Sequence, residues 1–273
     1  MTETYDLLDT QSGNAVVVAL DHGLNMGSVD GFERPESTLR AVLAGDPDGV
    51  LVGPHFARRF ADTLESSDVD VLLTADAALF SARPGARTGE DIWTPAFSTS
   101  FLREFDPKGI KVALVFGRDD PRVFERNVAH VCELAEQLHD TGIPLVVEPV
   151  MWGRHVPDDR STDPELVGNA SRLAWEYGAD VLKIPYTGDR ETFEPIVDAS
   201  PVPVTVLGGP SSGRTESMLE TVSEAVAAGA RGPIIGRSIW QTPDPERVVA
   251  ALGAVVHRNA DPADAWQDAA DGV

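Results

Sequence analysis

The segment Gly178-Ala-Asp-Val-Leu-Lys-Ile-Pro-Tyr-Thr-Gly-Asp189 places one lysine, Lys183, inside a predicted core strand. A run of Val, Leu and Ile bounded by Gly and Pro is typical of a buried strand, in which lysine is rare. Only three of the 22 basic residues are lysines, namely Lys108, Lys111 and Lys183. Burial favours the neutral form of an amine, which is the nucleophile that Schiff-base formation requires. The alternative is a lysine at a strand end that reaches solvent or pairs with a carboxylate.

Eight short apolar runs alternate with helical patterns along the chain. Besides the Lys183 segment, they are residues 14–20, 49–52, 69–73, 111–116, 144–150, 202–207 and 232–236. Helices are predicted at residues 34–44, about 56–64, 124–138, 164–177, 193–199, 215–228 and 245–256. Such alternation over about 250 residues predicts a (β/α)₈ barrel, a TIM barrel of the α/β class. A doubly wound open sheet is the rival, but no G-x-G-x-x-G follows the first strand.

The predicted barrel occupies residues 1–273 as a single domain, with a short tail from about residue 261 to 273 that adds a short helix. Residues 75–100 have no clear period and are rich in Ala, Gly, Pro and Thr. A loop of that length in a compact domain is usually functional or mobile.

Composition excludes several classes of protein. The net charge is −22, from 44 acidic and 22 basic residues, so the surface repels nucleic acid. Acid excess with few lysines predicts a halophilic protein from a salt-rich cytosol, where ions screen the self-repulsion. The alternative is an ordinary acidic protein at lower salt.

A cytoplasmic location is predicted from three further features. No apolar run approaches the roughly 20 residues of a membrane span, and the first residues lack the basic and apolar regions of a signal peptide. The single cysteine, Cys132, excludes an internal disulfide and fits a reducing compartment.

The carboxyl ends of barrel strands converge on one face, where barrel enzymes carry their chemistry. Asp21 and Glu148 follow or end two predicted strands and are expected to face Lys183, where carboxylates can transfer protons. The alternatives are a loop-capping role for Asp21 and a structural ion pair for Glu148. His22 is expected in the substrate- and phosphate-binding part of the site, as hydrogen-bonded scaffolding and not as a catalyst. The six histidines are scattered without metal-ligand spacing, so no metal is predicted.

Glycines follow the last two predicted strands. Gly208 and Gly209 come after the seventh strand, and Gly236 precedes Arg237 after the eighth. This pattern is typical of the barrel phosphate site, in which backbone N–H groups and a helix N-terminus hold the anion. The alternative is that these glycines only permit tight turns. Arg237 favours phosphate, because it adds a cation to a chain whose net charge repels anions.

Five segments together resemble a known family: Ala19–Gly23, Gly178–Lys183, Tyr186–Asp189, Pro203–Pro210 and Ile235–Gln241. In these segments the chain resembles the archaeal-type class I fructose-bisphosphate aldolases, the DhnA-type branch related to DeoC and LacD. The resemblance implies a barrel, Schiff-base chemistry at Lys183, a catalytic Asp21, and phosphate near Gly209 and Arg237. It also implies a cofactor-free enzyme that forms a homo-oligomer.

One stretch departs from the family pattern. Where members of the family carry Tyr-Pro-Arg-Gly after the fifth strand, this chain has Trp152-Gly-Arg154-His155. The family tyrosine donates and accepts the proton during C–C cleavage, whereas an indole N–H only donates. Either Glu148, His155 or Tyr186 takes that role, or the reaction differs, with Trp152 and Arg154 still expected at the site.

The predicted function is therefore a class I aldolase acting on a phosphorylated ketose, with cleavage like that of fructose-bisphosphate aldolase and release of dihydroxyacetone phosphate. The branch also resembles the transaldolase that makes 2-amino-3,7-dideoxy-heptulosonate, and thiolase-like relatives that act on phosphorylated pentanediones. From a different class, the alternative is a phosphate-binding barrel isomerase or a sugar-phosphate binder in which Lys183 is only an electrostatic contact.

Overall fold

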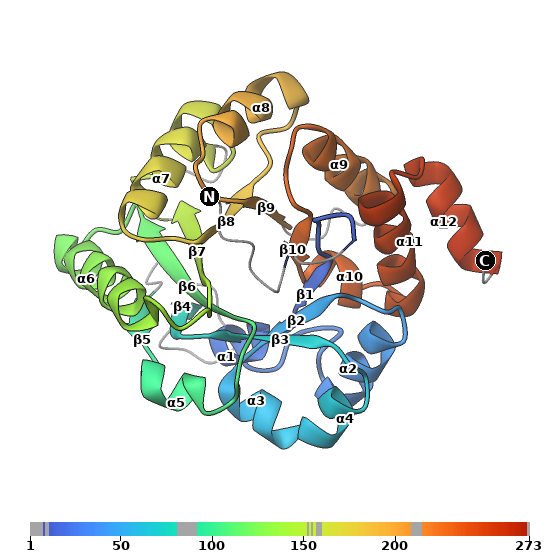
Figure 1. Cartoon of the computed structure of the whole chain (residues 1–273), viewed down its shortest axis with the longest axis horizontal. Coiled ribbons are helices and arrows are strands. Elements are labelled where there is room, and N and C mark those ends of the chain that lie inside the picture. Colours follow the sequence, from blue (N-terminus) through green and yellow to red (C-terminus); the bar gives the residue numbers. More distant parts are fainter. Residues whose placement is uncertain are drawn as a thin grey trace.

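The computed structural model describes Leu8 and residues 11–80, 92–151, 153, 155–156, 160–208 and 215–271. Its centre is a closed barrel of eight parallel strands surrounded by helices (Figure 1), which confirms the predicted fold. The strands, in their order around the barrel, are β1 (Val17–Ala19), β10 (Pro233–Ile235), β9 (Val204–Leu207), β8 (Val181–Pro185), β7 (Leu145–Met151), β6 (Gly109–Phe116), β3 (Asp70–Thr74) and β2 (Gly49–Val52).

Closure of the barrel pairs its first strand along the chain with its last. Val17 of β1 pairs with Gly49 of β2 on one side and with Ile234 of β10 on the other. The first strand is therefore an interior strand of the sheet, although it contains only three residues.

The helices lie outside the barrel, as Figure 1 shows. The long ones are α2 (Pro35–Leu43), α6 (Pro121–Leu138), α7 (Pro164–Glu176), α8 (Arg190–Asp198), α9 (Thr215–Ala227), α11 (Pro245–Arg258) and α12 (Pro262–Asp271). The short ones are α1 (His22–Met26), α3 (Pro54–Arg59), α4 (Ala61–Glu65), α5 (Thr99–Arg103) and α10 (Arg237–Trp240).

Helix α7 illustrates why the helices begin where they do. Its N-cap, Asp163, accepts hydrogen bonds from the backbone N–H groups of Glu165 and Leu166, and Pro164 occupies the first turn. The carboxylate thus satisfies N–H groups that have no partner within the helix. The prediction of an Asp163 cap is confirmed.

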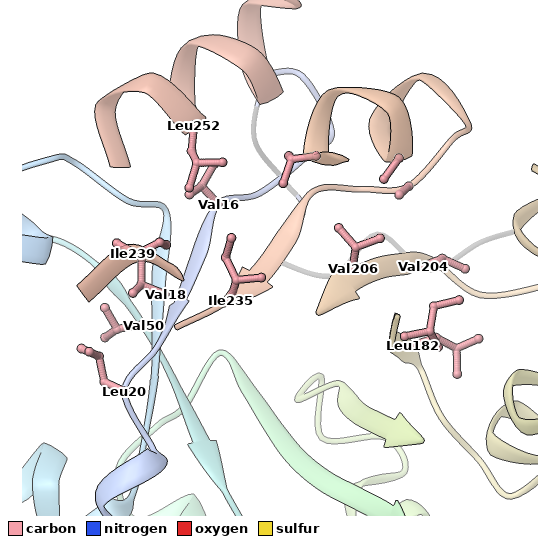
Figure 2. Packing of buried hydrophobic residues seen from close by; sticks show 14 of the residues in the cluster. Val16, Val18, Leu20, Val50, Leu182, Val204, Val206, Ile235, Ile239 and Leu252 are labelled. Atoms are coloured by element: carbon pink, nitrogen blue, oxygen red, sulfur yellow. The ribbon is translucent and has the colours of Figure 1, made fainter. Parts of the chain in front are cut away.

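Alternation along each strand divides the core into two layers. Val16, Val18 and Leu20 pack outward among the helices, in the cluster that Figure 2 shows with Leu252 of α11. Val17 and Ala19 point inward instead, into a cluster inside the barrel with side chains of other strands. This two-residue period decides which polar side chains enter the barrel.

Residues 75–100 contain regular structure that the sequence pattern did not predict. Strands β4 (Asp76–Phe80) and β5 (Ile92–Pro95) form an antiparallel pair, and α5 follows. The prediction of a featureless loop is therefore wrong at both ends of this stretch, while residues 81–91 lie outside the described residues. Strand β4 is hard to predict from the sequence because it contains small residues such as Ala77 and Ala78, and not the β-branched and aromatic residues that are typical of strands.

The predicted C-terminal tail forms α12. The guanidinium of Arg247 in α11 donates to the carbonyl oxygen of Trp266 and lies 3.6 Å from the centre of its ring. Among the helices of the described residues, none combines the length and the apolar composition needed to cross a bilayer.

Candidate active site

Strand alternation brings four charged side chains into the barrel. In β8, Val181 belongs to the inner cluster and Leu182 to the outer one, so the next inward position is Lys183. The same period in β7 gives Glu148, two residues after the inward Val146. Lys111 of β6 and Asp21, two residues beyond the inward Ala19, complete the set.

These side chains form one network of ion pairs. Nζ of Lys183 lies 3.0 Å from Oε2 of Glu148, and Nζ of Lys111 lies 3.1 Å from the same oxygen. Lys111 is also 3.7 Å from Oδ2 of Asp21 and 4.0 Å from Oδ1 of Asp76. The structure therefore brings together Asp21, Glu148 and Lys183, as the strand ends predicted, and adds Lys111 and Asp76.

The network controls the charge of Glu148. Burial would raise the pKa of this carboxyl group, but the ammonium groups of Lys183 and Lys111 outweigh burial and lower the pKa to about 2. Burial acts on Lys111 in the opposite sense, and the carboxylates of Glu148, Asp21 and Asp76 raise its pKa above the usual range. At neutral pH, Glu148 is therefore an anion and Lys111 a cation.

Asp76 is the most deeply buried acid of the network, with 1% of its surface exposed. Its Oδ2 accepts hydrogen bonds from Nε1 of Trp93 at 2.7 Å and from the backbone N–H of Ala113 at 2.9 Å. Burial raises its pKa, while Lys111 acts against that rise.

His22 stands at the edge of the network. Its Nδ1 is buried, lies 3.6 Å from Asp21, and has no hydrogen-bond partner among the described residues. The ring packs edge-on against Trp240, with 5.2 Å between ring centres. Burial lowers its pKa to about 4, so the imidazole is neutral at physiological pH. We expected His22 to be hydrogen-bonded scaffolding. In the structure it is instead a neutral ring that is held by packing against Trp240.

A cavity of about 420 Å³ opens at the carboxyl ends of the strands. Four members of the ion-pair network line it, namely Asp21, Lys111, Glu148 and Lys183, while Asp76 lies behind them. Gly208, Gly236 and Arg237 form another part of its wall. A Cβ on Gly236 would lie 2.3 Å from the carbonyl oxygen of Ala19, and one on Gly208 would lie 2.8 Å from a methyl carbon of Ile235. These two glycines are therefore required for close packing of the backbone against Ala19 and Ile235, and they also leave bare backbone at the cavity wall.

Trp152, Arg154 and Gly209 lie outside the described residues, so their predicted roles stay predictions.

Glu148, Tyr186 and His155 are the three candidates for the proton-transfer role of the family tyrosine, and they differ in position. Glu148 contacts Lys183 directly. Tyr186 also lines the cavity, but its hydroxyl donates to Glu224 at 2.8 Å, and burial together with Glu224 raises its pKa. The side chain of His155 is 65% exposed and pairs with Asp119. Glu148 is the candidate that the geometry favours.

A family model described as DeoC/LacD family aldolase matches residues 15–242. The chain belongs to this family. No set of three or more His, Cys, Asp or Glu side chains suited to a metal ion occurs within the described ranges.

Two curated relatives and one solved structure illustrate the family. The chain is 33% identical over 251 residues to 2-amino-3,7-dideoxy-D-threo-hept-6-ulosonate synthase of Halobacterium salinarum, covering 90% of this chain and 88% of that one. It is 30% identical over 267 residues to class 1 fructose-bisphosphate aldolase of Thermoproteus tenax, covering 94% and 95%. An archaeal fructose-1,6-bisphosphate aldolase, solved with its catalytic lysine bound to the carbinolamine intermediate, is 27% identical with a TM-score of 0.79, covering 94% and 99%.

Proposed function

We propose that this class I aldolase forms its Schiff base through Lys183, on a phosphorylated ketose. The observation that carries the proposal is the contact of 3.0 Å between Nζ of Lys183 and Oε2 of Glu148, at the wall of the cavity. A carboxylate in this position can accept a proton from the ammonium group, and the neutral amine can then add to the carbonyl carbon.

The protons can be followed through the proposed reaction. Addition of the Lys183 amine to the ketone gives a carbinolamine. Glu148 then donates the proton that it took from Lys183 to the hydroxyl group of the carbinolamine, and this group leaves as water. The resulting iminium ion withdraws the electron pair of the C–C bond while Glu148 removes the proton of the substrate hydroxyl beyond that bond. The aldehyde departs, and Glu148 returns the proton that it removed to the carbon of the remaining enamine, which gives a new iminium ion. Addition of water to this ion releases the ketone and restores Lys183.

Asp21 and the phosphate site complete the proposal. Asp21 is 6% exposed and faces the same cavity, where we assign it to orienting substrate hydroxyl groups. Arg237, with the backbone at Gly208 and Gly236, is assigned to the phosphate, because a guanidinium can bond two phosphate oxygens at once. Gly209 and Arg154 are proposed to contribute to phosphate binding on sequence grounds alone.

Cleavage of fructose bisphosphate with release of dihydroxyacetone phosphate is the first candidate reaction, after the relatives named as fructose-bisphosphate aldolases. A transaldolase reaction of the 2-amino-3,7-dideoxy-heptulosonate synthase type is the second, because the similarity to the Halobacterium enzyme is of the same extent. Trp152 in place of the family tyrosine favours the second candidate or another proton carrier.

The cellular setting belongs to the proposal as well. A net charge of −22 supports a salt-rich cytosol. We further propose a homo-oligomer, on the family resemblance.

Borohydride reduction tests the central assignment. Borohydride added during turnover should reduce the imine and leave a stable adduct on the peptide that contains Lys183. Lys183→Met should abolish both adduct and activity while circular dichroism shows an intact fold. An active Lys183→Met enzyme would overturn the Schiff-base assignment, and a sugar-phosphate isomerase or binder would then be the better interpretation.

A further inference from the structure

We propose that Asp76 and Trp93, on the β4–β5 hairpin, are positioning residues that hold the ammonium group of Lys111 in place. They thereby keep Glu148 able to accept a proton from Lys183. The inference rests on the proposed function of Lys183. It extends that function to a hairpin that is not part of the eight-stranded barrel.

The surroundings of Asp76 are the first support. A buried carboxylate is costly unless it is paired or hydrogen-bonded. Oδ2 has two neutral donors, Trp93 and the backbone of Ala113, whereas Oδ1 is buried without a hydrogen-bond partner among the described residues. Among the described residues, the cation that approaches Oδ1 is the ammonium group of Lys111, at 4.0 Å. Asp76 is thus fixed on one side and turned toward Lys111 on the other.

The position of Ala113 is the second support. Ala113 is two residues beyond Lys111 in β6, so both residues have the same face toward the barrel interior. The hydrogen bond from Ala113 therefore anchors Asp76 to the strand that carries Lys111. Trp93 lies across the hairpin, is 2% exposed, and fixes the carboxylate from the opposite strand.

The negative charge of Asp76 affects how strongly Lys111 interacts with Glu148. Lys111 faces three carboxylates, those of Glu148, Asp21 and Asp76. If Asp76 is neutral, the full charge of Lys111 acts on Glu148 and Asp21, which makes Glu148 a weaker proton acceptor. The charge of Asp76 therefore weakens the attraction between Lys111 and Glu148, so that Glu148 accepts a proton more readily. It also keeps the ammonium group of Lys111 between its three carboxylate partners.

Asp76→Asn tests this role, because it removes the charge and nearly preserves the shape. We expect kcat to fall by about 10- to 100-fold, the size of effect that loss of a supporting partner has at metal-binding histidines. KM should change little, since Asp76 does not line the cavity. Trp93→Phe, which removes one donor to Asp76, should cause a smaller loss in the same direction and add little to Asp76→Asn.

A double-mutant cycle with Lys111→Met separates positioning from a general structural role. In the Lys111→Met background, Asp76 is a buried carboxylate without its cation, so Asp76→Asn should raise stability to urea and should not lower kcat further. Additive losses of stability and kcat would overturn the proposal. The matched control is Asp180→Asn. The Asp180 carboxylate also accepts a backbone N–H, that of Leu145, but at the opposite end of the barrel, so this variant should lose stability and keep kcat.

The same experiments separate this inference from the proposed function. An imine adduct on Lys183 with an unchanged kcat in Asp76→Asn would refute only the role of Asp76. Absence of an adduct in the wild-type protein would refute the Schiff base, and the urea measurements would still decide whether Asp76 and Lys111 are coupled.

Discussion

Lys111 and Lys183 contact the same atom, Oε2 of Glu148, at 3.1 and 3.0 Å. Two ammonium groups so close would repel each other strongly in a buried site if the carboxylate did not lie between them. One lysine must become neutral to attack a carbonyl group, whereas three carboxylates keep Lys111 charged. The shared oxygen thus joins the proposed nucleophile to a permanent cation, and Glu148 serves both.

Glu148→Gln should therefore reduce turnover by at least about 100-fold, within the range that general acid–base catalysis supplies. Steady-state kinetics and borohydride trapping would measure the loss of cleavage and of imine formation separately. The matched control is Glu224→Gln, which removes the carboxylate that binds Tyr186. Near-normal turnover of Glu148→Gln together with a slow Glu224→Gln enzyme would move the proton transfer to Tyr186.

Arg237→Ala should weaken binding of phosphorylated substrates by about 2–5 kcal/mol, the usual cost of removing one side of a buried charged pair. Arg237→Lys should restore only part of the affinity, because an ammonium group lacks the planar pair of donors. Inhibition constants of a sugar phosphate and of its unphosphorylated analogue would show the difference. Arg231→Ala, in an exposed position at the other end of β10, is the control. Equal losses for both ligands would make Arg237 structural.

His22 should make the folded protein less stable as the pH falls from about 6.5 to about 4. In that interval the unfolded chain binds a proton at His22, whereas burial keeps the folded imidazole, with its pKa of about 4, neutral. The contribution is at most about 3 kcal/mol at the low end of the interval. Urea unfolding across this range should give a smaller slope for His22→Gln than for the wild type.

Glu148 acts in a separate pH interval. Its folded pKa of about 2 is below its ordinary value of 4.5, so the stability from its pairing is complete above pH 4.5 and is lost as the pH falls toward 2.

A His22→Gln protein whose stability still falls as steeply between pH 6.5 and 4 would refute the assignment to His22.

Salt should stabilise the protein. A net charge of −22 causes self-repulsion, and the screening length falls from about 10 Å at 0.1 M salt to about 3 Å at 1 M. The melting temperature should therefore rise from dilute buffer to molar KCl. Calorimetry over a KCl series measures this, with sucrose as the uncharged control. A constant melting temperature across the series would contradict a halophilic protein.

The barrel was predictable because each strand is a local apolar run. The strand predicted at residues 49–52 is the observed β2, while the run from residue 14 to 20 gives only Val17–Ala19 as paired strand. Asp21, Glu148 and Lys183 were predictable for a similar reason. Each lies near the carboxyl end of its own run, and a barrel brings those ends together.

Lys111 was missed because of the stagger between strands. The predicted strand began at residue 111, which placed this lysine at the opposite end of the barrel. The observed β6 begins at Gly109, and Lys111 pairs with Thr74, the last residue of β3. A closed barrel requires such a shift in register, and it cannot be derived from one strand alone. Asp76 had no local signal, because its burial depends on Trp93 and β6.

The pairing of β1 with both β2 and β10 also affects how the chain is made on the ribosome. Val18 cannot pair with Ile235 until more than two hundred further residues have been synthesised. At about 5–20 residues per second, this takes about 10–40 seconds, during which one edge of β1 has no partner strand. Asp21 and Lys183 cannot reach their final arrangement until that gap closes, so a nascent chain should gain activity only after release of its last barrel strand.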